Sequence, residues 1–284
     1  MNERLTEQMA RAGIADYRAI PFSACRVTFP ELLSRTPELT PRSVLLYAVP
    51  YFVGDAENLS DYAAAEDYHL FFRDLSRELI EELRREHPEA VAVAYVDHSP
   101  IDERDAAARA GLGIIGRHGL LIHPLYASFV YVGEIVTDLD VSLLPRAVEP
   151  SELRFCEDCG ACRRACPTGI LRGEVGSDCL SAITQRKGEL GDAELDLMYR
   201  CKTVWGCDLC QLACPHTKRA IRENTVKTPI PFFQSNRTSR LTYREVAEMP
   251  KEAFSRRAYA WRGRKTILRN LLAYEQREKT LPLP

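Results

Sequence analysis

The chain has 284 residues, 45% of them apolar and 27% charged, a composition typical of globular proteins with one or two hydrophobic cores and unlike that of a disordered chain. Its net charge of −2 hides an asymmetry: residues 216–284 hold 16 Lys and Arg against 6 Asp and Glu, which leaves 22 against 34, or −12, for residues 1–215. No apolar run approaches the ~18 residues of a transmembrane helix, and the first residues lack the apolar stretch of a secretory signal. We therefore expect a cytoplasmic protein whose two parts face different partners.

The first ninety residues mix helical and strand patterns. Apolar and charged positions alternate with helical spacing through residues 1–20, and Arg42–Tyr51 has the apolar run of a buried strand that ends in a proline turn. One long amphipathic helix is predicted from Asp61 to about His87.

A second strand is predicted at Ala90–Val96, and a third at Ser128–Val136. Between them, Ser99 followed by Pro100 indicates the N-cap and first turn of a helix that runs through Ala110. Strands and helices therefore mix, as in an α/β or α+β fold.

The cysteines are the strongest chemical signal. Nine of the ten lie between Cys156 and Cys214 in short CxxC-type spacings, which indicates metal rather than disulfides. The run Cys156-x2-Cys159-x2-Cys162-x3-Cys166-Pro167 is that of bacterial ferredoxins, in which three cysteines bind one 4Fe-4S cube and the fourth binds a second cube. Pro167 should end the helix there and turn Cys166 away.

A second run, Cys207-x2-Cys210-x3-Cys214-Pro215, completes the pattern. By the same crossing rule, the first cluster takes Cys156, Cys159, Cys162 and Cys214. The second takes Cys166, Cys207 and Cys210 and needs one more ligand, for which spacing leaves both Cys179 and Cys201 open. The alternative is a pair of four-cysteine zinc sites, which seldom use a three-cysteine run closed by Cys-Pro.

Three further features have competing interpretations. Gly111-Leu112-Gly113-Ile114-Ile115-Gly116 matches a dinucleotide motif, but a helix rather than a strand precedes it. Gly111 is better interpreted as the left-handed residue that ends this helix, and the later glycines as places where something bulky approaches the backbone. Asp97 lies at a strand end, where it serves either as an active-site acid or as an extra helix cap. Cys25 stands alone and is expected to be a buried apolar residue.

After the cysteines the chain turns basic, becomes helical from Arg244 and ends in a loose 281–284 segment. Its basic side chains recur at helical spacing, and they form either a phosphate-binding face or a solvated helix surface: Arg262, Arg264, Lys265 and Arg269.

Several motifs in one order resemble the epoxyqueuosine reductase family. They include Asp97-His98-Ser99-Pro100, the Glu103-Arg104 pair, Gly133-Glu134-Ile135 and the cysteine array, together with Asp67-Tyr68-His69, Thr184-Gln185-Arg186-Lys187-Gly188, Trp205-Gly206-Cys207-Asp208 and Trp261-Arg262-Gly263-Arg264-Lys265. The resemblance runs from about residue 40 to residue 272. It departs from the family at Arg117-His118-Gly119, at Tyr62-Ala63-Ala64-Ala65 and at Pro284, where longer members continue into a helical repeat domain.

The resemblance implies an α+β fold: a nitroreductase-like cobalamin-binding domain at residues 1–148, a double 4Fe-4S ferredoxin-like domain at 149–220 and a basic, mostly helical segment at 221–284 that packs back on the core. It implies that Cys179, in its Cys-x-Ser-x-x-Thr context, is the missing ligand of the second cluster. It also makes Asp97 the proton donor.

The same resemblance suggests which side chains contact the ligands. Cobalamin would lie against Asp97, Leu121, Val132 and Ile135, with weaker expectations for Arg35 and Ser60, while His69 and Lys187 would lie near the cavity. The tRNA substrate would contact Lys187, Arg262, Lys265 and Arg269.

The implied activity is reduction of epoxyqueuosine in tRNA to queuosine, with two 4Fe-4S clusters, cobalamin and an external low-potential donor of the ferredoxin or flavodoxin type. The alternatives are a short paralogue that reduces another substrate, a ferredoxin-type electron carrier without a substrate of its own, and a relative of reductive dehalogenases, which usually carry an export signal.

Overall fold

A computed structural model describes residues 3–174, 176 and 178–280 of the chain, so the predicted loose end at 281–284 lies outside the described residues. The chain packs as two compact units, each built from segments that are separate in sequence. The first unit contains the described residues up to Pro50 and those of Phe71–Cys159 and Ala220–Ile230; the second contains Tyr51–Leu70, Gly160–Arg219 and the described residues from Pro231 onward. The three-part division in chain order stays a prediction.

The first unit is built on a four-stranded sheet in the order β1 (Tyr17–Pro21), β2 (Ser43–Pro50), β6 (Val130–Thr137) and β3 (Ala92–Tyr95). Neighbouring strands are antiparallel, and every residue of β2 is buried because the strand lies between two others and is covered on both faces. An antiparallel sheet combined with helices is an α+β arrangement, as predicted.

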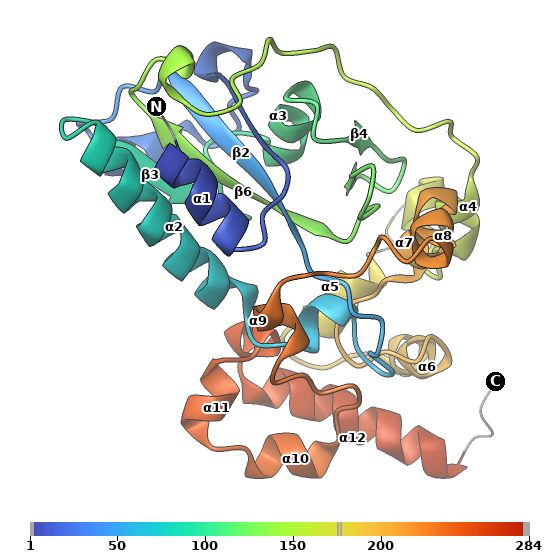
Figure 1. The fold of residues 1–284 in the computed structure, drawn as a ribbon. Helices are drawn as coiled ribbons and strands as arrows, with labels where there is room; N and C mark the ends of the chain where they lie inside the picture. Colours follow the sequence, from blue (N-terminus) through green and yellow to red (C-terminus); the bar gives the residue numbers. More distant parts are fainter. Residues whose placement is uncertain (1–2, 175, 177, 281–284) are drawn as a thin grey trace. The chain divides into compact units, whose positions relative to one another are not determined.

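One face of this sheet packs against α2 (Tyr68–Glu86), which continues into the first unit from Phe71 (Figure 1). The ring centroids of Tyr47 on β2 and Phe72 on α2 lie 6.0 Å apart. Gly133 on β6 lies beneath both rings, and a Cβ there would stand 2.3 Å from the Tyr47 ring and 2.5 Å from the Phe72 ring. The glycine is therefore required by packing. Helix α1 (Glu3–Arg11) precedes β1 in the same unit.

The other face of the sheet packs against α3 (Glu103–Arg109) through an apolar cluster that includes Val44, Val132, Val136, Ala107 and Leu112. A small hairpin follows, with β4 (Ile114–Ile115) paired to β5 (Leu121–Ile122). Short 3-10 helices lie at η1 (Phe22–Ala24), η2 (Pro30–Arg35) and η4 (Val141–Leu143).

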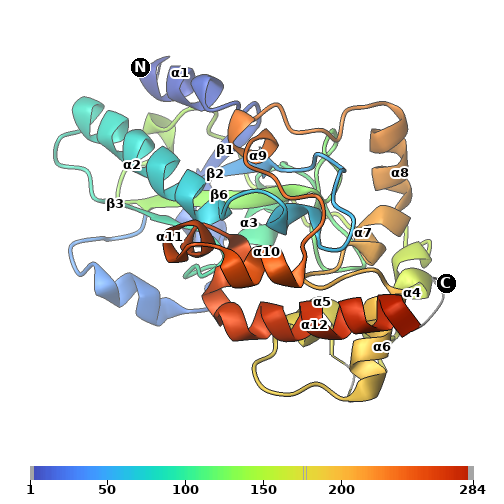
Figure 2. The same cartoon turned by 90° about the horizontal axis from the view of Figure 1, so that it is seen from below.

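The second unit is mainly helical. Figures 1 and 2 show α12 running alongside α10 and α6. Its core gathers large side chains such as Trp205, Tyr259 and Tyr274 around α12. The elements are η3 (Asp61–Ala63), α4 (Ala161–Ala165), η5 (Ile170–Arg172), α5 (Leu180–Gln185), α6 (Asp192–Arg200), α7 (Leu209–Ala213), α8 (Pro215–Arg222), whose last residues belong to the first unit, α9 (Pro231–Gln234), α10 (Tyr243–Glu248), α11 (Lys251–Ser255), η6 (Ala258–Arg262) and α12 (Arg264–Thr280).

Three predicted elements are corrected. The helix of residues 1–20 ends at Arg11, and Tyr17–Pro21 is the edge strand β1. The long helix begins at Tyr68 rather than Asp61, because a 3-10 turn at η3 comes first. The cap of α3 is Asp102, whose carboxylate accepts from the N–H groups of Arg104 and Asp105, rather than Ser99.

Gly111 has a φ of +80°, as predicted for the residue that ends a helix. The bulky group beside Gly113 is part of the chain itself: a Cβ there would stand 2.4 Å from the carbonyl oxygen of Ile122 on β5. Among the described residues, no helix is both long and apolar enough to cross a membrane.

Candidate functional site

The cysteine runs of the second unit form two similar helix ends. Cys162 lies in α4 and Cys210 in α7, and these two short helices pack together. Both helices stop one residue before a Cys-Pro pair, and Cys166 (ψ 114°) and Cys214 (ψ 131°) have extended backbones. The prediction that Pro167 ends the helix is therefore confirmed, since the residue before a proline disfavours the helical region.

The thiols of the second unit act on one another electrostatically. Burial, followed by the charges of Cys179, Asp208, Cys166 and Cys162, raises the pKa of Cys210 to about 12. Burial likewise raises the pKa of Cys207 to about 12, and Cys210 and Cys179 contribute to it. Cys210 thus lies within electrostatic range of both Cys166 and Cys179. Such buried thiols gain from metal binding, because a bound cation holds them as thiolates without a free buried charge.

Cys166 has a different environment. Burial raises the pKa of its thiol, but hydrogen bonds from the backbone at Leu171, Thr168 and Gly169 and from the Thr168 hydroxyl outweigh burial and lower it below the usual value. Cys201 lies within electrostatic range of Cys166. Burial raises the pKa of Cys201, and the charge of Cys166 raises it further.

The other two cysteines of the first run belong to the first unit. Cys156 is fixed against β4 by its N–H bond to the Ile115 carbonyl oxygen (3.0 Å), and its sulfur accepts from the Arg117 N–H at 3.3 Å. Arg117 also pairs with Asp158 at 3.4 Å. Cys25, in the same unit, is half-buried against the α3 cluster, and burial raises the pKa of its thiol to about 12.

None of the ten cysteines, all of which lie within the described residues, forms a disulfide. Within residues 3–174, 176 and 178–280, no group of three or more His, Cys, Asp or Glu side chains is close enough to hold a single metal ion. A single zinc at ~2.3 Å from each sulfur would draw the thiolates closer together than an iron-sulfur cube does. An all-thiol donor set suits a 4Fe-4S cube, which is held by four cysteine thiolates.

Asp97 lies just beyond β3 and has an exposed side chain. Its φ of +60° is in the left-handed region, which is uncommon for residues other than glycine and is favoured by Asp and Asn. The neighbouring His98 packs against Phe29 with tilted rings, whose centroids lie 5.6 Å apart. A strained residue at a strand end is the backbone signature of many active sites, although Asp97 does not cap α3.

Two more carboxyl groups lie near Asp97 in the first unit, and sequence reasoning missed both as site residues. Glu103, the first residue of α3, accepts a hydrogen bond from the backbone of Asp97, and burial followed by the charge of Asp97 raises its pKa to about 7. Glu134 on β6 accepts a hydrogen bond from the Ser99 hydroxyl, and burial raises its pKa to about 8 although that bond lowers it. The sequence contained one signal for Glu134: side chains alternate between the two faces of a strand, which places Glu134 on the same face as Val132 and Val136.

The structure brings only some of the predicted cobalamin contacts together. Leu121 and Val132 belong to the apolar cluster between the sheet and α3. Ile135 is fully buried, but alternation along β6 turns it to the opposite face from Val132. Arg35 is exposed at the end of η2 and lowers the pKa of Tyr95, on which burial acts more strongly in the opposite direction.

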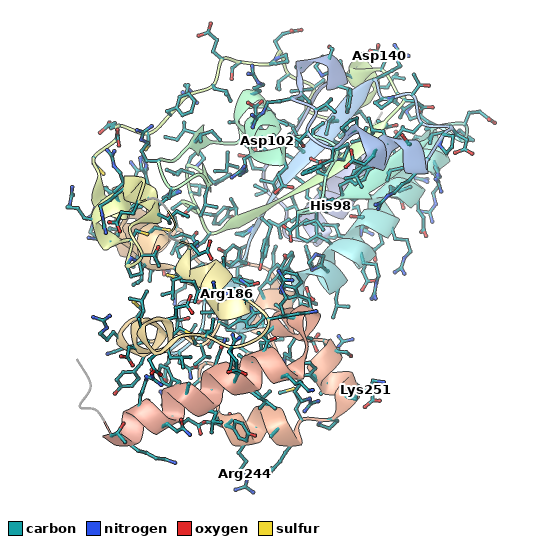
Figure 3. All side chains as sticks on the ribbon, turned by 180° about the vertical axis from the view of Figure 1, so that it is seen from behind. His98, Asp102, Asp140, Arg186, Arg244 and Lys251 are labelled. Atoms are coloured by element: carbon teal, nitrogen blue, oxygen red, sulfur yellow. The ribbon has the colours of Figure 1, made fainter. Side chains whose placement is uncertain are left out.

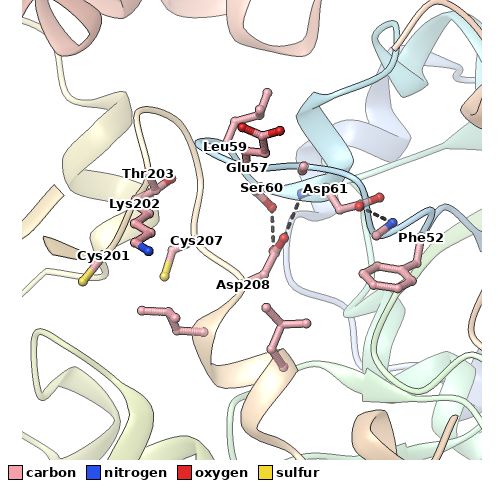
Figure 4. Close-up of a pocket in the computed structure, with 14 residues that line it drawn as sticks. Phe52, Glu57, Leu59, Ser60, Asp61, Cys201, Lys202, Thr203, Cys207 and Asp208 are labelled. Atoms are coloured by element: carbon pink, nitrogen blue, oxygen red, sulfur yellow. Dashed lines mark hydrogen bonds between the residues drawn. The ribbon is translucent and has the colours of Figure 1, made fainter. Parts of the chain in front are cut away.

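Ser60 lies in the second unit, in the wall of a cavity of about 200 Å³ that Cys201, Lys202 and Cys207 also line (Figure 4). Its hydroxyl donates to Asp208 at 2.5 Å, and the Asp61 N–H donates to the same carboxylate at 2.8 Å. The cavity is smaller than the 300–1,000 Å³ of ordinary cofactor pockets, so it does not hold a corrin by itself.

The predicted tRNA contacts lie in the second unit, where two are exposed lysines and two are arginines that already make contacts within the protein. Lys187 and Lys265 are exposed. Arg269 donates to the carbonyl oxygens of Arg186 (2.8 Å; Arg186 is labelled in Figure 3) and Gly188. Arg262 lies over the exposed ring of Trp261, 3.6 Å from its centroid. His69 bonds to Asp67 at 2.8 Å and stacks on Tyr68.

Comparison with known proteins identifies the module and the family. Residues 155–217 match the family model described as a 4Fe-4S double cluster binding domain. An epoxyqueuosine reductase of Gloeobacter violaceus is 34% identical over 226 residues, which cover 76% of this chain and 69% of that protein. One of Staphylococcus aureus is 31% identical over 250 residues, which cover 82% of this chain and 63% of that protein.

A crystal structure of epoxyqueuosine reductase with a tRNA-Tyr epoxyqueuosine-modified tRNA stem loop superposes with a TM-score of 0.73 at 22% identity, and the match covers 96% of this chain and 80% of that one. The fold is therefore shared. The chain spans about two thirds of the length of the two curated relatives, and on this similarity it belongs to the epoxyqueuosine reductase family.

Proposed function

We propose that this chain is a cobalamin- and iron-sulfur-dependent reductase that converts epoxyqueuosine in tRNA to queuosine, with Asp97 as the proton donor. The observation that carries the proposal is that one chain of this family combines a double-cluster module with an exposed, left-handed aspartate at the end of β3. The reaction removes the epoxide oxygen as water and therefore requires two electrons and two protons.

In this proposal the first cluster is held by Cys156, Cys159, Cys162 and Cys214 and the second by Cys166, Cys179, Cys207 and Cys210. Cys179 and Cys166 raise the pKa of Cys210 after the larger effect of burial, as Asp208 and Cys162 also do, so Cys210 lies within electrostatic range of both proposed partners in the second set. Electrons enter from an external low-potential donor of the ferredoxin or flavodoxin type, because four-thiolate cubes reach strongly negative potentials.

The first unit has the side chains expected around a corrin. Apolar residues that are only partly buried, among them Tyr95, Val130 and Ile115, join Val132 and Leu121 beside the end of β3. Exposed Val27 and Phe29 add apolar surface in the same unit. Cobalamin, when bound, supplies a low-potential metal centre for reduction at the epoxide carbon. The role of the chain is to bind it, exclude water and place the Asp97 carboxyl group within reach of the oxygen.

Asp97→Asn tests this proposal with little backbone disturbance, because Asn tolerates the left-handed conformation that Asp97 adopts. We expect the variant to keep its iron and to bind cobalamin normally, but to lose turnover by roughly 10²–10⁴-fold, since an amide cannot donate the proton. The measurement is anaerobic incubation with cobalamin, a reductant and epoxyqueuosine tRNA, followed by nucleoside analysis.

Full activity of Asp97→Asn would remove Asp97 from this role. Failure of the unchanged chain to retain cobalamin would favour the electron carrier, which needs no corrin site. Cobalamin retention without any conversion of epoxyqueuosine tRNA would favour a paralogue with another substrate.

A further inference from the structure

The first unit contains a buried carboxyl pair next to Asp97 that the proposed reaction does not yet use. Removal of the epoxide oxygen as water delivers two protons to one oxygen atom, whereas Asp97 holds a single proton at a time. A second proton source close to Asp97 would supply the difference.

Glu134 lies deep in the fold, with 1% of its surface exposed. The Ser99 hydroxyl donates to one carboxyl oxygen, and the Ser99 oxygen accepts from the Ile101 N–H at 3.0 Å. The other oxygen, Oε2, is buried and makes no hydrogen bond within the described residues. An ionised carboxylate in this position would be costly, whereas a protonated one has a hydrogen free for a neighbour.

The groups around Glu134 do not favour its charge. Tyr95 on β3 is the residue paired with Glu134 on β6. Burial raises the pKa values of Tyr47 and Cys25, and the charge of Glu134 raises both further. Glu103 faces it from α3 and raises its pKa further. Asp105 and Arg109, also on α3, act on Cys25. Among the residues that the structure describes, no cation contributes to the pKa of Glu134.

Glu103 connects this residue to Asp97. Its carboxyl group accepts a hydrogen bond from the Asp97 backbone, which helps to hold the left-handed turn, and its Oε2 is buried and makes no hydrogen bond in the described part of the chain. Asp97 and Asp102 oppose its ionisation and Arg104 favours it. The carboxyl groups thus follow one another from the sheet interior to the surface in the order Glu134, Glu103, Asp97.

We propose that Glu103 and Glu134 store the second proton of the reaction and pass it to Asp97. The inference rests on the proposed function. The Asp97 carboxylic acid gives its proton to the oxygen of the opening epoxide, which becomes a hydroxyl group. The Asp97 carboxylate takes the proton of Glu103, and Glu103 is reprotonated by Glu134. Asp97 then protonates the hydroxyl group, which leaves as water, while the two electrons come from the clusters through the cofactor. Solvent finally returns two protons.

The raised pKa values of both glutamates, about 7 for Glu103 and about 8 for Glu134, agree with a pair that is protonated near neutral pH. A purely structural role would need only an acceptor for the Asp97 N–H and for the Ser99 hydroxyl. Glutamine provides that acceptor but no transferable proton, so Glu103→Gln and Glu134→Gln separate the two roles.

The first measurement is an infrared pH titration of the full chain with its clusters, between about pH 5 and about pH 9. We expect a carbonyl band of protonated carboxyl groups that persists at neutral pH, is lost in Glu134→Gln, is reduced in Glu103→Gln and is unchanged in Glu89→Gln, an exposed glutamate of the same unit. No such band at neutral pH in the unchanged chain would overturn the proposal.

The second measurement is the pH dependence of single-turnover reduction of epoxyqueuosine tRNA by the loaded enzyme. The donors act in their protonated form, so the rate of the unchanged enzyme falls as pH rises through their pKa values. In either glutamine variant the rate at and above neutral pH should be lower by roughly 10²-fold, and a small carboxylic acid in the buffer should restore it.

Profiles and rates equal to those of the unchanged enzyme in both variants would reject the relay even if the infrared band is present. If the unchanged chain does not reduce epoxyqueuosine tRNA at all, the proposed function fails, whereas the infrared titration still shows whether the pair stores a proton. The partly buried Glu103 keeps the test decisive if Glu134→Gln does not fold.

Discussion

Glu134 is an ionisable residue on a strand face that is otherwise apolar, and its burial has a consequence for stability. Its pKa is about 8 in the folded chain against a usual value of 4.5, because burial disfavours its charged form. Folding therefore favours the protonated group. The contribution is fully present below pH 4.5, declines as pH rises and is lost above the folded pKa.

We accordingly predict that Glu134→Gln flattens the pH dependence of stability. In the unchanged chain, this residue lowers the free energy of unfolding by up to about 1.4 kcal/mol for each pH unit between its unfolded and folded pKa values. Urea denaturation at about pH 5 and about pH 8 measures the effect as the difference between variant and unchanged chain. An equal difference at both pH values would contradict it, and Glu89→Gln serves as the control.

The positions of Cys179 and Cys201 at two helix ends favour Cys179 as the fourth ligand of the second cluster. Cys179 is the N-cap of α5, has an extended backbone and is exposed, so its thiol is available, whereas Cys201 is the C-cap of α6 and packs with an apolar cluster of Leu180, Ile183 and Met198. Cys179 raises the pKa values of Cys207 and Cys210, whereas Cys201 is not among the groups that act on either thiol.

Cys179→Ser is therefore expected to lower the iron content of the chain from that of two cubes toward that of one. Cys201→Ser should leave the iron content unchanged. Iron analysis and electron paramagnetic resonance of the reduced protein measure both outcomes. The opposite pattern, with iron lost only in Cys201→Ser, would exchange the two assignments.

Helix α12 supports the segment before Cys207 through one buried side chain. Asn270 is fully buried, and its amide donates to the carbonyl oxygens of Thr184 (2.7 Å) and Val204 (2.8 Å). Thr184 in turn accepts from the Gly206 N–H at 3.0 Å. The residue before Cys207 is thus positioned by α5, and α5 by α12.

Asn270→Ala should lower the free energy of unfolding by about 1–3 kcal/mol, because two buried carbonyl oxygens lose their donor. It should also weaken retention of the second cluster. Urea denaturation and iron retention during anaerobic dialysis measure the two effects, with Gln276→Ala, which removes an exposed amide from the same helix, as a control. An equal loss of stability in Gln276→Ala would be inconsistent with this account.

What sequence could predict depends on whether the determinants are local. The ends of α4 and α7 follow from the proline after each cysteine, and the left-handed Gly111 follows from the end of α3. Strand β1 was missed because Arg18 and Pro21 interrupt its apolar pattern, which an edge strand tolerates. The prediction of Ser99 as a helix cap was wrong because its hydroxyl donates to Glu134, which lies 35 residues away in sequence.

At the scale of the whole molecule, the charge asymmetry corresponds to a second unit with many basic side chains. Some of these side chains already make contacts within that unit. Arg264 donates to the Val246 carbonyl oxygen at 2.5 Å and lies over the Phe254 ring, and Arg269 holds the Arg186–Gly188 segment. These two guanidinium groups stabilise the fold of the unit. Lys187 and Lys265 are better candidates for phosphate contacts, since both side chains are exposed at the surface of the unit.

We predict that Lys187→Ala and Lys265→Ala each weaken tRNA binding and reduce the slope of log affinity against log salt by about 1, because each lysine that neutralises a phosphate releases a counterion. Lys251→Ala, on the exposed side of α11 (labelled in Figure 3), removes the same charge and controls for the net charge of the unit. Filter binding or fluorescence titration over a salt series gives the slopes. Equal slopes for all three variants would mean that affinity follows net charge alone, and a slope near zero in the unchanged chain would mean that its basic side chains form a solvated surface without phosphate contacts.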